Sequence, residues 1–267
     1  MPIAIVALLP ISGGRIAAQE ASRVDYRSDS DRRGLEIARE AESRTGGYSD
    51  FQALLRMELR GRDGDLRERE LEVSALVVAG EGERTLLVFR SPRDLAGTSL
   101  LSHAHEDGGE DQWLFLPSMK RVKRIASAKR SASFMGSEFA YEDVSSSDVD
   151  RFTWQFIGLD RVENRDMYLL DRFPRDDGSG YSRQRVLVDR ESYLPIRIEY
   201  FDDRGEHLKT LRLTDYAFHG PCWRPATMTM ENHRTGRITR LDWSDFRFDT
   251  GLAPRRFTPD DLSRRGR

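Results

Sequence analysis

The sequence predicts a mainly β protein, built on one long antiparallel sheet that curls, with a few short helices. Apolar residues recur at every second position in many segments, for example at Leu55, Met57 and Leu59. Acidic turns that contain glycine, such as Asp202–Gly205, separate these segments at short intervals. A flat open sheet of about ten strands would leave long exposed edges, so we expect the sheet to curl or close on itself.

Composition excludes several classes of protein. The 267 residues carry 43 basic and 45 acidic side chains, so the formal net charge is −2. This balance gives no global reason to expect a nucleic-acid partner. The mean hydropathy of −0.64 leaves no room for several membrane-spanning segments. An aromatic content of 9% with a net charge near zero is typical of a folded chain rather than a disordered one.

The first element is an apolar run, Ile3–Ile11, which is followed by small residues and then by a sharp rise in polarity. The run is too short to span a bilayer, and its surroundings are typical of a secretory signal peptide. We therefore predict a signal peptide over residues 1–20, cleaved between Ala17 and Ala21, and one mature domain over residues 21–267. Because no Lys or Arg precedes the run, a cytosolic chain with an apolar first strand is the alternative.

Three helices are predicted. Asp31–Arg44 has the apolar spacing of an amphipathic helix, and Gly46 follows it as a plausible C-cap. A second short helix is expected at Tyr141–Ser147. The third begins after Thr258, a good N-cap residue, with Pro259 at its first position.

The alternating segments between these helices predict strands with one dry and one wet face. In chain order they are Leu55–Leu59, Leu71–Val77, Phe152–Phe156, Ile196–Tyr200, Leu211–Leu213, Met228–Met230 and Leu241–Trp243. The predicted hairpin turns are Arg62–Asp65, Gly80–Gly82, Asp107–Gly109, Asp176–Gly180, Asp202–Gly205 and Arg234–Gly236. A succession of strands joined by hairpins indicates an antiparallel meander.

Catalytic signatures are absent from the sequence. It has no GxSxG, HExxH or GxxxxGK[ST] motif, and we predict no catalytic residue and no cofactor. His103 and His105 would point the same way on a strand, and with Glu106 or Asp107 they would suit a metal ion. Two solvated histidines beside a loop are the simpler interpretation, so we predict no metal site. The single cysteine, Cys222, is expected to be a buried thiol.

Cationic side chains gather between Lys120 and Arg130, directly after the predicted strand Asp111–Pro117. Such a cluster suggests an anion-binding loop for phosphate or lipid head groups. A solvated edge strand that is protected by its charges is the alternative. The residues predicted to contact a head group or a partner are Arg121, Lys123 and Arg124.

The same region carries a resemblance to a known family. The run DQWLFLPSMKRVKRI at 111–125, followed by SFMGSEFAYEDV at 133–144, resembles the bacterial outer-membrane lipoprotein-sorting (LolA-like) family, in its longer uncharacterised branch. Phe115 stands where that branch commonly has Tyr, and Glu138 where it commonly has Asp. The resemblance implies an incomplete LolA/LolB-like β-barrel with a few lid helices.

The resemblance also implies a function, that of a periplasmic carrier. Such a protein binds lipid or lipoprotein acyl chains in an apolar cavity for outer-membrane sorting. An inner-membrane transporter is a further expected partner, nucleic acid is not expected, and we expect a monomer. The alternatives are an accessory periplasmic subunit of an envelope transporter complex and, more remotely, a lipid-acting hydrolase.

Candidates for the cavity wall come from the dry faces of the predicted strands, which carry methionines and large aromatic residues suited to an adaptable pocket. They are Leu55, Met57, Leu59, Val73, Val77, Trp113, Phe115, Trp154, Phe156, Met228, Met230 and Trp243. A filled barrel core is the alternative for each of these residues.

Overall fold

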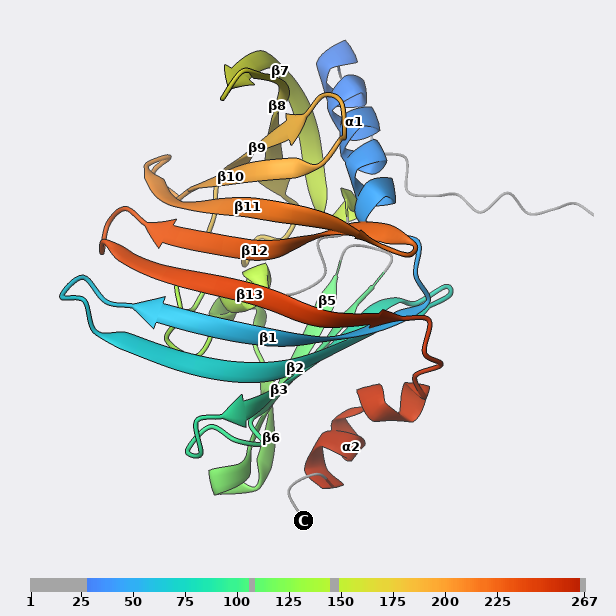
Figure 1. Cartoon of the computed structure of the whole chain (residues 1–267), viewed down its shortest axis with the longest axis vertical. Helices are drawn as coiled ribbons and strands as arrows, with labels where there is room; N and C mark the ends of the chain where they lie inside the picture. The colour runs from blue at the N-terminus through green and yellow to red at the C-terminus, as the bar shows by residue number, and fades with distance from the viewer. Residues whose placement is uncertain (1–27, 106–108, 145–148, 265–267) are drawn as a thin grey trace, which may run out of the picture.

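The computed structural model describes residues 28–105, 109–144 and 149–264. The predicted signal peptide, residues 1–20, lies outside the described residues. One antiparallel sheet of 13 strands dominates the fold, in the order β6-β5-β4-β3-β2-β1-β13-β12-β11-β10-β9-β8-β7 (Figure 1). The sheet curls without closing, because β6 and β7 remain as its two edges. This confirms the predicted mainly β fold.

The strands are β1 (Asp50–Arg60), β2 (Leu66–Val78), β3 (Gly82–Ser91), β4 (Ser99–Ala104), β5 (Glu110–Leu116), β6 (Arg121–Ile125), β7 (Phe152–Val162), β8 (Arg165–Pro174), β9 (Arg183–Asp189), β10 (Pro195–Phe201), β11 (His207–His219), β12 (Cys222–Asn232) and β13 (Arg237–Phe248). The helices are α1 (Asp29–Thr45) and α2 (Pro259–Arg264). Short 3₁₀ turns lie at Pro117–Met119, Ser127–Lys129, Tyr141–Asp143, Val149–Arg151 and Pro254–Phe257.

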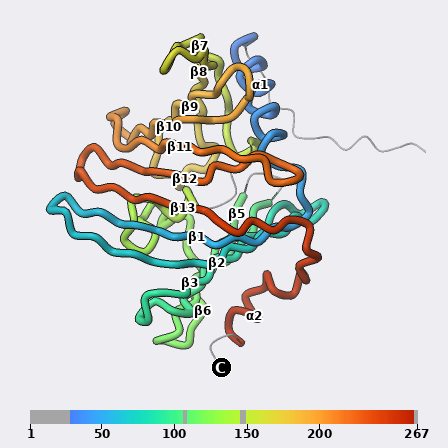
Figure 2. Tube along the Cα trace, in the orientation of Figure 1, coloured from blue at the N-terminus to red at the C-terminus, as the bar shows by residue number. Residues whose placement is uncertain are grey.

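The strands form two meanders that meet in the middle of the sheet. Each strand pairs with its neighbour in sequence, except where β1 pairs with β13. At that junction Met57 lies opposite Leu241, and both side chains are buried. Figure 2 shows how the trace curves through this junction, with β7–β10 above it and β3 and β6 below it.

Helix α1 packs against the edge strand β7. Its first turn is capped by Ser28, whose Oγ accepts a hydrogen bond from the Asp31 amide at 3.2 Å. Gly34 lies so close to the backbone of Gln155 that an added Cβ would be 2.8 Å from it. The predicted helix at Asp31–Arg44 is thus confirmed, and it covers one sheet edge that would otherwise be open.

The second predicted helix is only partly present. Tyr141–Asp143 forms a single 3₁₀ turn, and residues 145–148 lie outside the described residues. The third is confirmed, because the Thr258 Oγ1 accepts a hydrogen bond from the Asp261 amide at 3.2 Å at the start of α2.

The outer face of β2–β5 is covered by the C-terminal tail. Leu86, Leu101 and Phe115 are buried there against Phe257 and Leu262 in a second, smaller apolar cluster. These strands are therefore dry on both faces, with the main core on the concave side and the tail on the outer side.

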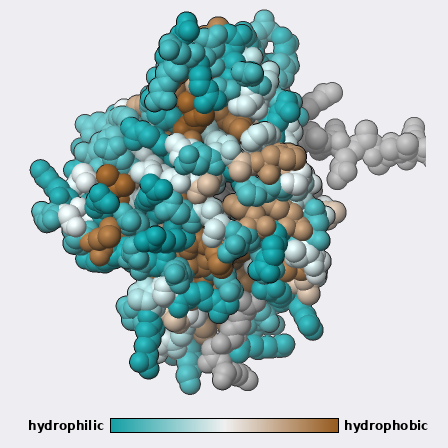
Figure 3. All heavy atoms as spheres, in the orientation of Figure 1, coloured by the Kyte–Doolittle hydropathy of each residue, from teal (hydrophilic) through white to brown (hydrophobic). Residues whose placement is uncertain are grey.

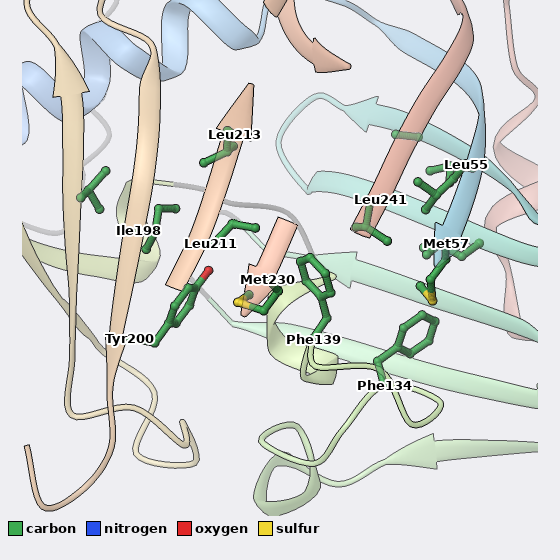
Figure 4. Packing of buried hydrophobic residues seen from close by; sticks show 14 of the residues in the cluster. Leu55, Met57, Phe134, Phe139, Ile198, Tyr200, Leu211, Leu213, Met230 and Leu241 are labelled. Carbon is green, nitrogen blue, oxygen red and sulfur yellow. The ribbon is translucent and has the colours of Figure 1, made fainter. Parts of the chain in front are cut away.

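A segment that we call the plug segment, residues 126–144, crosses the concave face. Phe134 and Phe139 are buried in the main core, and Figure 4 shows them inserted from this segment toward Met57 and Leu241. Two consecutive left-handed residues, Met135 with φ 51° and Gly136 with φ 78°, form a tight turn between the phenylalanines.

Candidate functional site: two cavities on the concave face

The larger hollow, which we call the wide cavity, has a volume of about 550 Å³. Its wall is mainly apolar and comes from both sides of the β1–β13 junction, with Leu55 and Met57 on β1 and Leu241 and Trp243 on β13. Phe139 of the plug segment adds to this wall. The wide cavity therefore lies in the middle of the curled sheet.

The second hollow, which we call the narrow cavity, has a volume of about 200 Å³. It lies between α1, which contributes Ala38 and Ala41, and strands β7–β11, which contribute Trp154 and Ile198 among others. The two cavities share the lining residues Glu42, Thr45, Asp143 and Met228. They are therefore adjacent compartments on one concave face.

A buried ion pair fixes the plug segment to the sheet between these compartments. The Lys209 Nζ on β11 donates to the Asp143 Oδ2 at 2.6 Å and to the Glu138 carbonyl oxygen at 3.0 Å. The Tyr181 hydroxyl donates to the same Asp143 carboxylate at 3.0 Å. Burial, together with the negative charge of Asp143, raises the pKa of Tyr181 well above its usual range, so the phenol stays a donor.

Further hydrogen bonds tie the plug segment to three more strands. The Glu138 amide donates to the Thr239 Oγ1 on β13 at 3.0 Å. The Asn232 Nδ2 on β12 donates to the Glu138 Oε2 at 2.7 Å. Arg69 on β2 donates to the Met135 carbonyl oxygen at 2.6 Å. The plug segment therefore closes one end of the concave face.

Both cavities have arginines in their walls, Arg224 in the wide cavity and Arg151 and Arg172 in the narrow cavity. In the wide cavity the Arg224 guanidinium lies 4.9 Å from the ring centroids of Tyr48 and Phe51. In the narrow cavity the Arg172 guanidinium lies 4.3 Å from the ring centroid of Phe152, and its Nε donates to the Gln184 Oε1 at 2.8 Å. Both sites place a cation on aromatic rings inside an apolar hollow.

Most of the predicted wall residues line a cavity. Those that line the wide cavity are Leu55, Met57, Val73, Val77, Met228 and Trp243. Trp154 lines the narrow cavity together with the shared Met228. Leu59 and Met230 are buried in the main core without lining either hollow, and Phe156 packs under the Arg33 guanidinium at 3.9 Å.

Trp113 and Phe115 lie elsewhere. Both belong to the cluster beneath the C-terminal tail, on the outer face of β5, so the structure does not bring them to either cavity. Sequence reasoning missed the plug phenylalanines and the cavity arginines, among them Arg172 and Arg224. The motif at 133–144 was the available signal for Phe134 and Phe139, whereas no pattern marked Arg172 or Arg224.

The three predicted contact cations are all exposed on the edge strand β6, but they do not share a face. Arg124 forms an ion pair with Asp111 on β5. Arg121 and Lys123 alternate with it along the strand and point to the opposite face. The residues Arg121–Arg124 therefore lie on an exposed edge strand, and their contact with a head group or a partner stays a prediction.

The histidines and the cysteine have ordinary structural surroundings. The His103 Nε2 lies 2.8 Å from the Phe257 carbonyl oxygen, and the His105 Nε2 lies 3.3 Å from the Asp111 Oδ2. Within residues 28–105, 109–144 and 149–264, no group of three potential metal ligands is present. Cys222 is buried, as predicted, and burial raises the pKa of its thiol.

A space-filling view shows how hydrophilic and hydrophobic residues are distributed on one face of the molecule. In Figure 3 the visible face is mostly hydrophilic, and apolar atoms show in separate patches toward its middle. No helix in the described part of the chain is long and apolar enough to cross a membrane.

Comparison with known proteins identifies the family. A family model described as an uncharacterized protein matches residues 81–264. A domain from Vibrio parahaemolyticus, provisionally named as an outer membrane lipoprotein-sorting protein, is 40% identical and superposes with a TM-score of 0.84 over 87% of this chain and 99% of that one. The chain belongs to the LolA-like outer-membrane lipoprotein-sorting family.

Other members of this LolA-like group have the same fold. A DUF1329 family protein from Desulfovibrio piger is 28% identical, with a TM-score of 0.83 over 88% of this chain and 100% of that one. A LolA superfamily protein from Nitrosomonas europaea is 21% identical, with a TM-score of 0.72 over 85% and 98% of the two chains. No curated protein matches the sequence.

Proposed function

We propose that this protein is a periplasmic carrier that shields an acyl chain of a lipid or lipoprotein while the chain is moved toward the outer membrane. The observation that carries the proposal is the pair of adjacent apolar cavities on the concave face of a sheet that does not close. Two observations support the periplasm as its location. The chain belongs to the LolA-like family, and we interpret the apolar run Ile3–Ile11 as an export signal.

The dimensions of the wide cavity suit such a ligand. Its volume of about 550 Å³ lies within the usual range of small-molecule sites. Removal of apolar surface from water contributes about 25 cal/mol per Å², so an acyl chain needs no specific polar contact to bind. Met57, Met228 and the aromatic Trp243 give a wall that adapts to a flexible chain.

The proposed role is one of binding and transfer, with no reaction assigned to the cavity. Arg121 and Lys123 stay our prediction for contact with a head group or an acidic partner surface, since both are exposed on β6. Arg124 is a weaker candidate, because Asp111 already neutralises it.

Native ligand content tests the proposal most directly. The protein is purified from its native host, and its lipids are extracted and identified by mass spectrometry. We expect stoichiometric acyl-containing lipid, and we expect delipidated protein to bind dodecanol in calorimetry. A protein that carries no lipid and binds no dodecanol would contradict a carrier function.

A matched pair of variants locates the binding site. Val77 is 45% exposed and lines the wide cavity, whereas Leu54 is 41% exposed on the outer face of β1. V77N places an amide at the cavity wall and should weaken dodecanol binding roughly fivefold or more, because the amide loses water without gaining a partner. L54N makes a similar change outside the cavity and should bind dodecanol as the unaltered protein does.

A further inference from the structure

Two arginines line the narrow cavity, and they differ in their partners: Arg151 forms an ion pair with Glu110 at 3.2 Å, whereas Arg172 is buried without a counter-ion among the described residues. Its side chain lies on β8 and the residue is only 9% exposed. Within the described residues its polar contact is the hydrogen bond to Gln184, and no carboxylate forms an ion pair with it. The rings of Phe152 and Trp154 lie 4.3 Å and 5.5 Å from the guanidinium carbon.

The cavity carboxylates, in contrast, are already engaged by other donors. Asp143 accepts from Lys209, and Asp176 forms an ion pair with Arg130. Glu142 accepts from the Ser179 hydroxyl at 2.6 Å and from the Gly180 amide at 2.9 Å. The acidic groups of the narrow cavity therefore have partners of their own, and Arg172 is left with its charge directed into the hollow.

An isolated buried cation is unfavourable, and an incoming anion relieves that cost. Transfer of a charge out of water carries a penalty that aromatic contacts offset only in part. Burial accordingly lowers the pKa of the Arg172 guanidinium, although an arginine side chain remains protonated. The two terminal nitrogens of the guanidinium form no hydrogen bond within the described residues, and a carboxylate or phosphate group matches their geometry.

We propose that the narrow cavity binds the anionic head group of a single-chain amphiphile, a carboxylate or phosphate held by Arg172, while the chain extends past Met228 into the wide cavity. Met228 lines both hollows, so the path between them is continuous along the concave face. The proposal rests on the carrier function proposed above and adds the chemical class of the ligand. It predicts that the chain end of the ligand, rather than its head group, lies under the plug phenylalanines.

Calorimetry with ligands of one chain length tests the head-group preference. Delipidated full-chain protein is titrated with dodecanoate, dodecyl phosphate and dodecanol, and with inorganic phosphate as the chain-free anion. We expect one or both anionic amphiphiles to bind about tenfold or more tightly than dodecanol, as a buried charge-assisted contact requires. The tighter of the two anions identifies the head group as carboxylate or phosphate.

Variants assign that preference to Arg172. R172M should remove the difference between the anionic amphiphiles and dodecanol while dodecanol affinity is kept. R183M is the control, because it removes the same charge from the next strand, β9. Arg183 points to the opposite face of the sheet, where it forms an ion pair with Asp171. Since Arg172 lacks a counter-ion, R172M should have an unchanged or raised melting temperature without ligand.

The outcomes separate the two proposals. If neither dodecanoate nor dodecanol binds, the carrier function itself fails. If the unaltered protein binds dodecanol and both anions equally, the carrier function stands and the anion site is wrong, whether or not R172M folds. If inorganic phosphate binds as tightly as dodecyl phosphate, the proposal of an amphiphilic ligand is wrong and the cavity is a site for free anions. R172K, which keeps the charge but loses the two-donor geometry, should weaken anion binding several-fold.

Discussion

Lys209 and Asp143 determine where the plug segment stands on the sheet. Their charged atoms are 2.6 Å apart, and both side chains are almost fully buried. A buried ion pair adds little net stability compared with an apolar pair, but removal of one partner leaves the other charge without compensation. These two residues therefore act as a fixed attachment point rather than as a large source of stability.

K209M should lower the free energy of unfolding by about 3–5 kcal/mol, because it leaves the Asp143 carboxylate buried beside Tyr181 without its cation. The matched control is R212M on the same strand, which removes an exposed ion pair with Glu231 and should change stability by less than about 1 kcal/mol. Urea unfolding of both variants gives the comparison. Equal losses in the two variants would contradict the role of Lys209.

At the scale of elements, two segments without regular alternation complete the two faces of the sheet. The plug segment places Phe139 on the concave face, and the C-terminal tail places Phe257 on the outer face. Both rings are buried, at 2% and 0% exposure, but Phe139 alone of the two lines the wide cavity. Because the two rings are equally buried but only one lines the wide cavity, their substitutions can be compared to separate an effect on stability from an effect on the ligand.

F139A and F257A should each cost about 3–5 kcal/mol of unfolding free energy, since each removes a buried ring. Their effects on ligand should differ. F139A enlarges the wide cavity, so the time for dodecanol or a fluorescent fatty acid to exchange should shorten several-fold. F257A should leave that exchange time unchanged. Stopped-flow displacement measures both, and slower exchange in F139A would show that the ring does not stand over the ligand.

The reliability of sequence alternation depends on what covers each strand. On β1 the outer face is wet, so Leu55 and Met57 alternate with exposed residues, and both line the wide cavity. On β5 both faces are covered, so Leu114 and Phe115 are buried side by side. Apolar residues at every second position then indicate a strand, but they do not show which face of that strand lines the cavity. The position of a covering tail is a tertiary property that no local pattern contains.

Turn chemistry explains why sequence reasoning left out β8. Five of the six predicted glycine turns lie at the junctions of consecutive strands, whereas Asp107–Gly109 lies largely outside the described residues. The turn between β7 and β8 instead uses Glu163 with φ 49° and Asn164 with φ 65°. This is the left-handed pair of a two-residue hairpin, made without glycine. A turn of this kind gives no glycine signal and lowers the number of strands that the sequence predicts; we expected about ten, and the sheet has 13.

At the scale of the whole molecule, Asp50 joins the start of β1 to the C-terminal tail. Its carboxylate accepts hydrogen bonds from the amides of Thr250, Gly251 and Leu252 at 2.9, 2.8 and 3.1 Å. Burial acts to raise the pKa of Asp50, but the hydrogen bonds from Thr250, Leu252 and Gly251 outweigh it and lower the pKa. A lowered pKa means that ionised Asp50 stabilises the fold above about pH 5, and that this contribution is lost as the pH falls through the folded-state pKa.

D50N should therefore reduce the free energy of unfolding by about 2 kcal/mol at pH 7, because an amide cannot accept as a carboxylate does. The difference between D50N and the unaltered protein should shrink as the pH falls below about 4, where Asp50 of the unfolded chain takes up a proton, and it should be lost below the lowered pKa of the folded state. Urea unfolding at a series of pH values measures this convergence. A difference that stays constant down to pH 2 would show that charge is not the cause.

The junction of β1 with β13 has a consequence for how the protein becomes active. Every other strand pair forms between neighbours in sequence, so the two meanders can grow locally, whereas the junction must wait for the ends of a long loop to meet. A slip of one residue there would turn the inward side chains of one meander outward. The wide cavity straddles this junction. We therefore expect the wide cavity to form late in folding, so that, if the protein is the carrier proposed above, an incompletely folded chain would have no site with which to capture lipid.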